Sequence, residues 1–114
     1  MVPKFDQAFS AMLEDLEASG LLKTTLVICL SEFGRTPRIN GHVGRDHWPK
    51  VFSVVLAGGG VKGGATVGPS DDFGYKPADR RHPTEVYDIH ATILYLLGID
   101  HTKLAVRHNG IDRR

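Results

Sequence analysis

The sequence predicts an α/β fold that forms part of a mostly parallel sheet flanked by helices. The segment 24–30 is a continuously apolar run rich in β-branched residues, which is typical of a strand covered on both faces, and the segment 51–57 is again strand-like. Two segments with apolar residues at helical spacing, 4–19 and 84–97, stand before and after them in the chain. This order indicates an α/β domain, in which ligands bind at the carboxyl ends of parallel strands.

Glycines and a polar residue set the ends of the two predicted helices. Gly20 is the natural stop of the first helix, and Gly98 that of the second, which begins with Thr84 as its N-cap. On the last helix, His90 falls on the apolar stripe, where a hydrogen-bonded core histidine is commoner than a metal ligand.

The remaining segments read as loops and one short strand. Residues 31–50 lose all periodicity and form a long loop after the first strand. Residues 58–68 are glycine-rich, with a short strand predicted at 65–67. A polar loop follows at 69–81, and the tail at 101–114 has no clear period.

Length and composition bound the class of protein. The 114 residues suit a single domain, predicted to span 1–114. The 41% of apolar residues can form a core without disulfides or a structural metal. A lone cysteine, Cys29, excludes an internal disulfide and a cysteine-based zinc cluster. The net charge of +1 offers no basic stripe, so we expect no nucleic-acid partner. No apolar run approaches the ~20 residues that span a bilayer, so we expect no membrane span.

The long loop carries a candidate metal site. Glu32 stands just past the first strand, and His47 lies fifteen residues later on the returning loop. Carboxylate oxygen and neutral imidazole nitrogen both bind zinc, manganese or iron, so the two can converge on one cation. Spacing alone leaves a second interpretation open, in which Glu32 pairs with an arginine of the loop and His47 caps a turn.

The same loop carries a candidate oxyanion site. Residues 32–50 hold four basic and two acidic side chains, and the planar guanidinium group matches the oxygens of phosphate, sulfate or carboxylate. Arg35 and Arg45 are the candidate ligands of such an oxyanion. A solvated charged loop, or an ion pair between Arg45 and Asp46, explains the same residues equally well.

Two further motifs are set aside. Residues 58–63 match the glycine pattern of dinucleotide-binding loops, but the residues that follow cannot form the helix whose amino end holds the pyrophosphate. Ser31 stands at a strand end without the G-x-S-x-G elbow of serine hydrolases. We therefore interpret the first as a turn and the second as a hydroxyl bonding to loop backbone.

Three ordered motifs carry a family resemblance. They are LSEFGRTPR at 30–38, GRDHWP at 44–49 and LAGGGVKGG at 56–64. With them, the chain resembles, over almost its whole length, the C-terminal part of a sulfatase-like protein of the domain of unknown function 1501 family, a branch of the alkaline phosphatase superfamily. The resemblance implies a large parallel sheet between helices and hydrolysis of phosphate or sulfate esters at a metal centre.

The resemblance also assigns residues. In the superfamily an Asp-His-Gly triplet at a strand end and a later histidine bind metal, and these fall on Glu32, Phe33 and Gly34, and on His47. Glu32 stands where the triplet has aspartate, so its side chain is one methylene longer. Phe33 stands where the triplet has histidine, so one metal ligand is lost. Asp46 and His42 are secondary ligand candidates that this loss suggests. The expected cofactor is a divalent metal, namely zinc, manganese or calcium.

The resemblance predicts a C-terminal fragment of a larger sulfatase-like domain. The nucleophile of the superfamily lies in an N-terminal half that nothing in these residues matches, so we expect no turnover from the chain alone. Relatives are exported, which suggests a periplasmic bacterial protein. The expected partner is a phosphate or sulfate ester, with self-association as a means of covering sheet edges.

Two other functions stay open. The loss of the triplet histidine at Phe33 favours a degenerate, non-catalytic binding or structural module of the same fold. A self-sufficient small α/β ligand binder is a third interpretation, which requires the sheet edges to be covered by another chain because two strands make a weak sheet.

Overall fold

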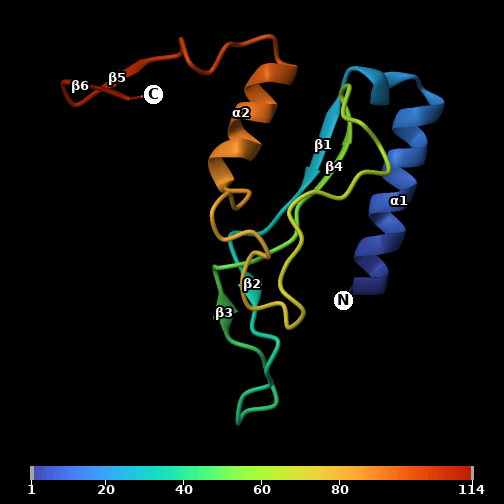
Figure 1. Ribbon diagram of the computed structural model, residues 1–114. Helices are drawn as coiled ribbons and strands as arrows, with labels where there is room; N and C mark the ends of the chain where they lie inside the picture. The colour runs from blue at the N-terminus through green and yellow to red at the C-terminus, as the bar shows by residue number, and fades with distance from the viewer. Residues whose placement is uncertain (1, 114) are drawn as a thin grey trace. The chain divides into compact units, whose positions relative to one another are not determined.

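The computed structural model describes residues 2–113 and divides into two compact units, one ending at Pro83 and the other beginning at Thr84. Figure 1 shows their elements. In residues 2–113 the strands form three separate two-stranded antiparallel sheets, which pair β1 with β4, β2 with β3, and β5 with β6. The expectation of a mostly parallel sheet flanked by helices is therefore wrong.

The first unit begins with the predicted amphipathic helix. Helix α1 spans Val2–Ala18, and the 3-10 turn η1 follows at Leu21–Lys23. Gly20 joins them with a φ of 75°, a left-handed conformation that glycine adopts without steric cost. The helix and its glycine stop are thus confirmed.

The sheet of β1 and β4 decides the fold class. Strand β1, Leu26–Cys29, pairs with β4, Val55–Gly58, in a register that opposes Leu26 to Gly58 and Cys29 to Val55. Parallel strands need a crossover connection, which is usually a helix. The segment 30–54 instead contains a hairpin and no helix, so the chain returns along β1 in the opposite direction.

The apolar content of β1 indicated cover on both faces, but its four residues are half-buried rather than buried. None of the side chains that the structure describes is buried, and the stripe of α1 at Phe9, Leu13 and Leu16 is also only half-buried. Phe5 and Phe9 stack with ring centroids 5.4 Å apart. The apolar run at 24–30 therefore located β1 without fixing the direction in which it pairs.

The boundaries of two other predicted strands need correction. β4 begins at Val55, four residues later than the predicted start at residue 51. Residues 65–67 form no strand, and the nearest pairing is an isolated antiparallel bridge between Ser70 and Pro77.

The second unit contains helix α2 and one hairpin. Helix α2 spans Val86–Leu96 with Glu85, not Thr84, as its N-cap, and the amide of Glu85 donates to Asp88 Oδ2 at 2.7 Å. His90 is exposed, although the helical spacing placed it on the buried stripe. In residues 2–113, neither helix is long and apolar enough to cross a membrane.

The tail is more ordered than its sequence suggested. Strand β5, Val106–His108, pairs with β6, Ile111–Arg113, through a two-residue turn. Asn109 and Gly110 both have positive φ, 51° and 78°. Positive φ at both central residues is typical of the type I′ turn that joins hairpin strands.

Candidate functional site

The hairpin of β2, Gly34–Arg35, and β3, His47–Trp48, carries the candidate site (Figure 1). Its register opposes Gly34 to Trp48 and Arg35 to His47. A Cβ atom at Gly34 would overlap the carbonyl oxygen of Val51. Glycine at this position therefore lets the chain pass close to the segment that leads into β4.

On one face of the hairpin, a side chain from the segment after β1 contacts a side chain of strand β3. The rings of Phe33 and His47 stack with centroids 3.9 Å apart and an interplanar angle of 25°. The Arg35 guanidinium lies 5.5 Å from the Phe33 ring centroid, within the range of a cation–π contact. Glu32 precedes Phe33 and is exposed. Phe33, Arg35 and His47 are thus brought together, whereas no contact places Glu32 beside His47.

The Arg45 side chain braces the loop that closes this hairpin, residues 36–46. Its Nη1 donates to the carbonyl oxygen of Thr36 at 2.8 Å and also to that of Pro37. The Arg35 guanidinium donates in turn to the Arg45 carbonyl oxygen at 3.2 Å. The ion pairs found in residues 2–113 are His82–Asp79 and Lys103–Asp100, so a pair between Arg45 and Asp46 is not formed there.

Asn40 organises the tip of the 36–46 loop. Its Nδ2 donates to Asp46 Oδ1 at 2.8 Å, and its Oδ1 accepts the backbone amides of His42 and Gly44 at 3.0 Å each. The same turn holds Val43 at a φ of 60°, a strained conformation for a β-branched residue. His42 is exposed at this tip. Of the two secondary ligand candidates, the Asp46 side chain therefore accepts a hydrogen bond from Asn40 that holds the loop. His42 takes part in the loop through its backbone amide, which donates to Asn40.

The family model described as "Protein of unknown function (DUF1501)" matches residues 1–114. The chain belongs to this family. No curated protein and no protein of solved structure matches it. This assignment confirms the DUF1501 part of the resemblance carried by the three motifs, two of which, LSEFGRTPR and GRDHWP, contain the two strands of the hairpin.

A second aromatic cluster fixes the hairpin of the DUF1501 chain to the segment 69–78. The Trp48 indole Nε1 donates to the Tyr75 carbonyl oxygen at 2.9 Å, and the two rings meet edge to face with centroids 5.6 Å apart. Lys50 Nζ lies 5.2 Å from the Trp48 ring centroid. Asp71 Oδ1 closes the segment by accepting the Tyr75 amide at 2.7 Å.

The fit to a metal can be judged from the ligand types that come together. In residues 2–113 no group of three or more His, Cys, Asp or Glu side chains could hold an ion. Catalytic zinc sites use three protein ligands and an open position. Glu32 and His47 therefore do not form a catalytic metal centre with the described residues alone.

The carboxyl groups whose pKa is lowered lie outside this hairpin. Backbone amides of Arg81 and His82 donate to Asp79 and lower its pKa. At Asp100, hydrogen bonds from Thr102 and Lys103 have the same effect on the pKa. Both carboxylates accept hydrogen bonds from residues that follow them closely in the chain, and so stabilise local turns.

Three residues of the site were not predicted. Asn40 and Thr36 hold the loop, and Tyr75 anchors it to a segment that the sequence presented only as polar loop. Asn40-Gly41 is a typical turn pair, so it could have marked the loop tip. No local signal links Trp48 with Tyr75, because they lie 27 residues apart.

Proposed function

We propose that this chain supplies part of the site of a metal-dependent phosphate or sulfate ester hydrolase of the sulfatase-like, alkaline phosphatase type. The observation that carries the proposal is the stack of Phe33 on His47 within the β2–β3 hairpin. It brings His47 into contact with Phe33, the residue that follows the proposed ligand Glu32.

In this proposal Glu32 and His47 contribute two ligands to a divalent cation, which is zinc, manganese or calcium. Such a cation polarises ester oxygens and lowers the pKa of a bound water. Arg35 is the better oxyanion ligand, since it is opposite His47 in the register and its guanidinium donates one hydrogen bond, to the Arg45 carbonyl oxygen. The Arg45 guanidinium is engaged by two carbonyl oxygens, so we assign it the positioning of the loop. The substrate is a phosphate or sulfate ester.

Metal titration by calorimetry tests the ligand assignment. Zinc, manganese and calcium are titrated into the chain and into the Glu32→Gln and His47→Gln variants, with His82→Gln as control because His82 is exposed and outside the hairpin. We expect each site variant to weaken binding of the preferred metal at least tenfold and the control to leave it unchanged. Binding that is absent, or indifferent to both site variants, contradicts the assignment.

A turnover assay tests whether this chain hydrolyses esters by itself. Because the described residues provide neither a full ligand set nor an assigned nucleophile, we expect no appreciable hydrolysis of 4-nitrophenyl phosphate or 4-nitrophenyl sulfate by the chain alone, with any of the three metals. A robust metal-dependent rate abolished by His47→Gln would overturn this expectation.

A second candidate function is a non-catalytic binding or structural module of the same family. It is favoured by the Phe33 ring covering one face of His47 and by the internal hydrogen bonds of Arg45. These contacts give both residues a structural role. Metal titration separates the two functions, because the module predicts no metal affinity that depends on Glu32 and His47.

Self-association remains a separate proposal. The sheet of β1 and β4 has an unpaired edge on each strand within residues 2–113, and exposed strand edges favour pairing with another chain. A discrete dimer in size-exclusion chromatography supports it, and a monomer at all concentrations contradicts it.

A further inference from the structure

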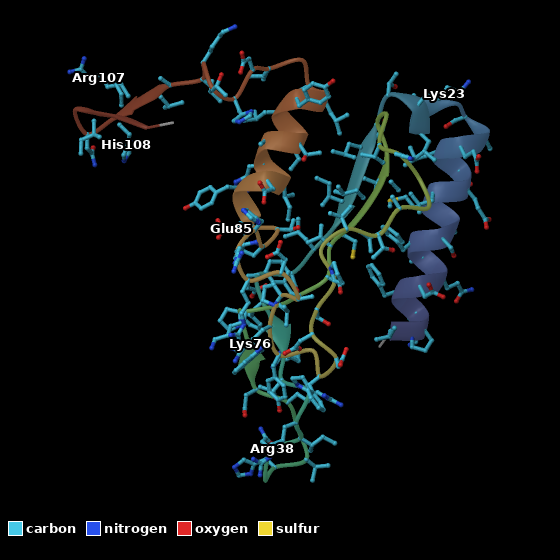
Figure 2. All side chains as sticks on the ribbon, in the orientation of Figure 1. Lys23, Arg38, Lys76, Glu85, Arg107 and His108 are labelled. Carbon is cyan, nitrogen blue, oxygen red and sulfur yellow. The ribbon has the colours of Figure 1, made fainter. Side chains whose placement is uncertain are left out.

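A cleft of about 320 Å³ lies in the first unit between the 36–46 loop and Tyr75. Its lining consists of Thr36, Arg38, Ile39, Asn40, Asp46 and Tyr75. This volume is at the lower end of the ~300–1,000 Å³ found for small-molecule sites. Arg38, Ile39 and Asp46 are exposed, so the cleft is open to solvent. Figure 2 shows Arg38 at the tip of the loop.

Hydrogen bonds hold the residues that line the cleft in place before any ligand binds. Thr36 and Asp46 are joined twice, by the Thr36 amide to the Asp46 carbonyl oxygen at 3.0 Å and by the Asp46 amide to Thr36 Oγ1 at 3.1 Å. The Asn40 side chain holds Asp46, and the Trp48 indole holds the Tyr75 backbone. Because these hydrogen bonds already order the loop, the protein loses little conformational entropy when a ligand binds, and this favours binding.

The polar groups of the cleft divide into engaged and available ones. Thr36 Oγ1 accepts from Asp46 and donates to the Arg38 carbonyl oxygen at 2.8 Å, so it is engaged. In the described residues the Arg38 guanidinium takes part in no hydrogen bond or ion pair, and of the Asp46 carboxylate only Oδ1 is bonded. The cleft is thus lined by residues that provide a free guanidinium group, Arg38, and a free carboxylate oxygen, Asp46, together with Ile39 and Tyr75.

We propose that this cleft binds a small anionic molecule that also carries a hydroxyl group. The planar guanidinium of Arg38 matches the oxygens of a phosphate, sulfate or carboxylate. The free oxygen of Asp46 accepts a hydrogen bond from the hydroxyl group and repels a ligand that is anionic throughout. Ile39 and the Tyr75 ring contact the carbon skeleton between the two groups. The proposal is independent of Glu32 and His47, which do not line the cleft.

Three probes separate the two points of recognition. Glycerol 3-phosphate carries both groups, inorganic phosphate only the anion, and glycerol only hydroxyl groups. Binding is followed by amide chemical-shift changes in the full chain with a chelator present. We expect glycerol 3-phosphate to bind roughly tenfold more tightly than phosphate, the effect of one hydrogen bond to a charged group, and glycerol not to bind measurably.

Conservative variants assign the contacts. Arg38→Gln should abolish binding of both anions. Asp46→Asn keeps an oxygen for the Asn40 bond but replaces the free oxygen by a donor, so it should remove the preference for glycerol 3-phosphate over phosphate. Arg81→Gln, in an exposed segment outside the cleft, is the control for a general loss of positive charge.

Two results would overturn the proposal. Equal affinity for glycerol 3-phosphate and phosphate shows an anion contact without a hydroxyl contact. Binding unchanged by Arg38→Gln and Asp46→Asn places the ligand elsewhere. Glu32→Gln and His47→Gln should leave anion binding in the cleft unchanged while weakening metal binding. The proposal for the cleft and the proposal for the metal site can therefore be refuted independently.

Discussion

The two hairpins of the chain are specified in different ways. Between β5 and β6, two residues, Asn109 and Gly110, adopt the positive φ that the turn needs, and the three residues of β5 are all exposed. Between β2 and β3, the turn is an eleven-residue loop held by the side chains of Asn40 and Arg45. The β5–β6 hairpin depends on backbone preference at its turn, whereas the β2–β3 hairpin depends on side-chain hydrogen bonds between residues six and nine positions apart in its loop.

The largest expected effect is at Gly34. Gly34→Ala places a Cβ against the Val51 carbonyl oxygen, a backbone atom that cannot move freely. We expect it to destabilise the β2–β3 hairpin by about 3 kcal/mol, the upper range for overpacking. Hydrogen exchange of the Thr36 amide, which donates to the Asp46 carbonyl oxygen, measures this opening. Gly41→Ala is the matched control, because nothing lies within 4 Å of that added atom, and equal effects in both variants contradict the prediction.

The next effect concerns the side-chain bonds of the loop. Asn40→Ala removes one donor to Asp46 and the acceptor of two backbone amides. We expect a loss of about 1–2 kcal/mol in the free energy of opening of the 36–46 loop, since the bonds are largely exposed. Faster exchange of the Gly44 amide reports it. Unchanged exchange of that amide would show that the Asn40 bonds do not hold the loop.

A smaller effect is expected at the turn of the other hairpin. Gly110→Ala forces an alanine to a φ of 78°, which costs about 1 kcal/mol. Fraying of β5 and β6, seen as loss of cross-strand nuclear Overhauser effects between Arg107 and Asp112, is the measurement. Retention of these effects at wild-type strength would mean that the hairpin does not depend on its turn.

The smallest effect has the opposite sign. Val43 has a φ of 60° and is 87% exposed, so its side chain adds strain without packing. Val43→Gly should stabilise the 36–46 loop by about 0.5–1 kcal/mol. Slower exchange of the Gly44 amide supports this expectation, and faster exchange would show that the Val43 side chain has stabilising contacts.

The comparison explains how far the sequence predicts the fold. The helices and the position of β1 follow from local patterns, such as the stripe of Phe9, Leu13 and Leu16 and the stop at Gly20. The β5–β6 hairpin was also predictable, because Asn-Gly between strand residues is a strong turn signal that the irregular tail concealed. The antiparallel direction of β4 was not predictable, since the apolar run is typical of a parallel strand covered on both faces, whereas β1 is half-buried and pairs antiparallel with β4.

The candidate site was predictable only as a set of residues. Spacing and resemblance selected Glu32, Arg35 and His47, but the stack of His47 on Phe33 depends on a register that a loop without periodicity sets. The role of Arg45 as a brace depends on which carbonyl oxygens the loop turns inward. Such contacts arise from tertiary structure and leave no pattern in a single sequence.

The central claim is that the β2–β3 hairpin assembles metal ligands from the end of β1 and the returning loop. Substoichiometric Mn²⁺, added while proton resonances of the chain are recorded, tests it most directly, because a paramagnetic ion broadens the signals of nearby nuclei. We predict that the Glu32, Phe33 and His47 side-chain signals broaden first and that His47→Gln abolishes this selectivity. Broadening centred on another histidine, such as His82 or His101, or no selective broadening, would contradict the claim.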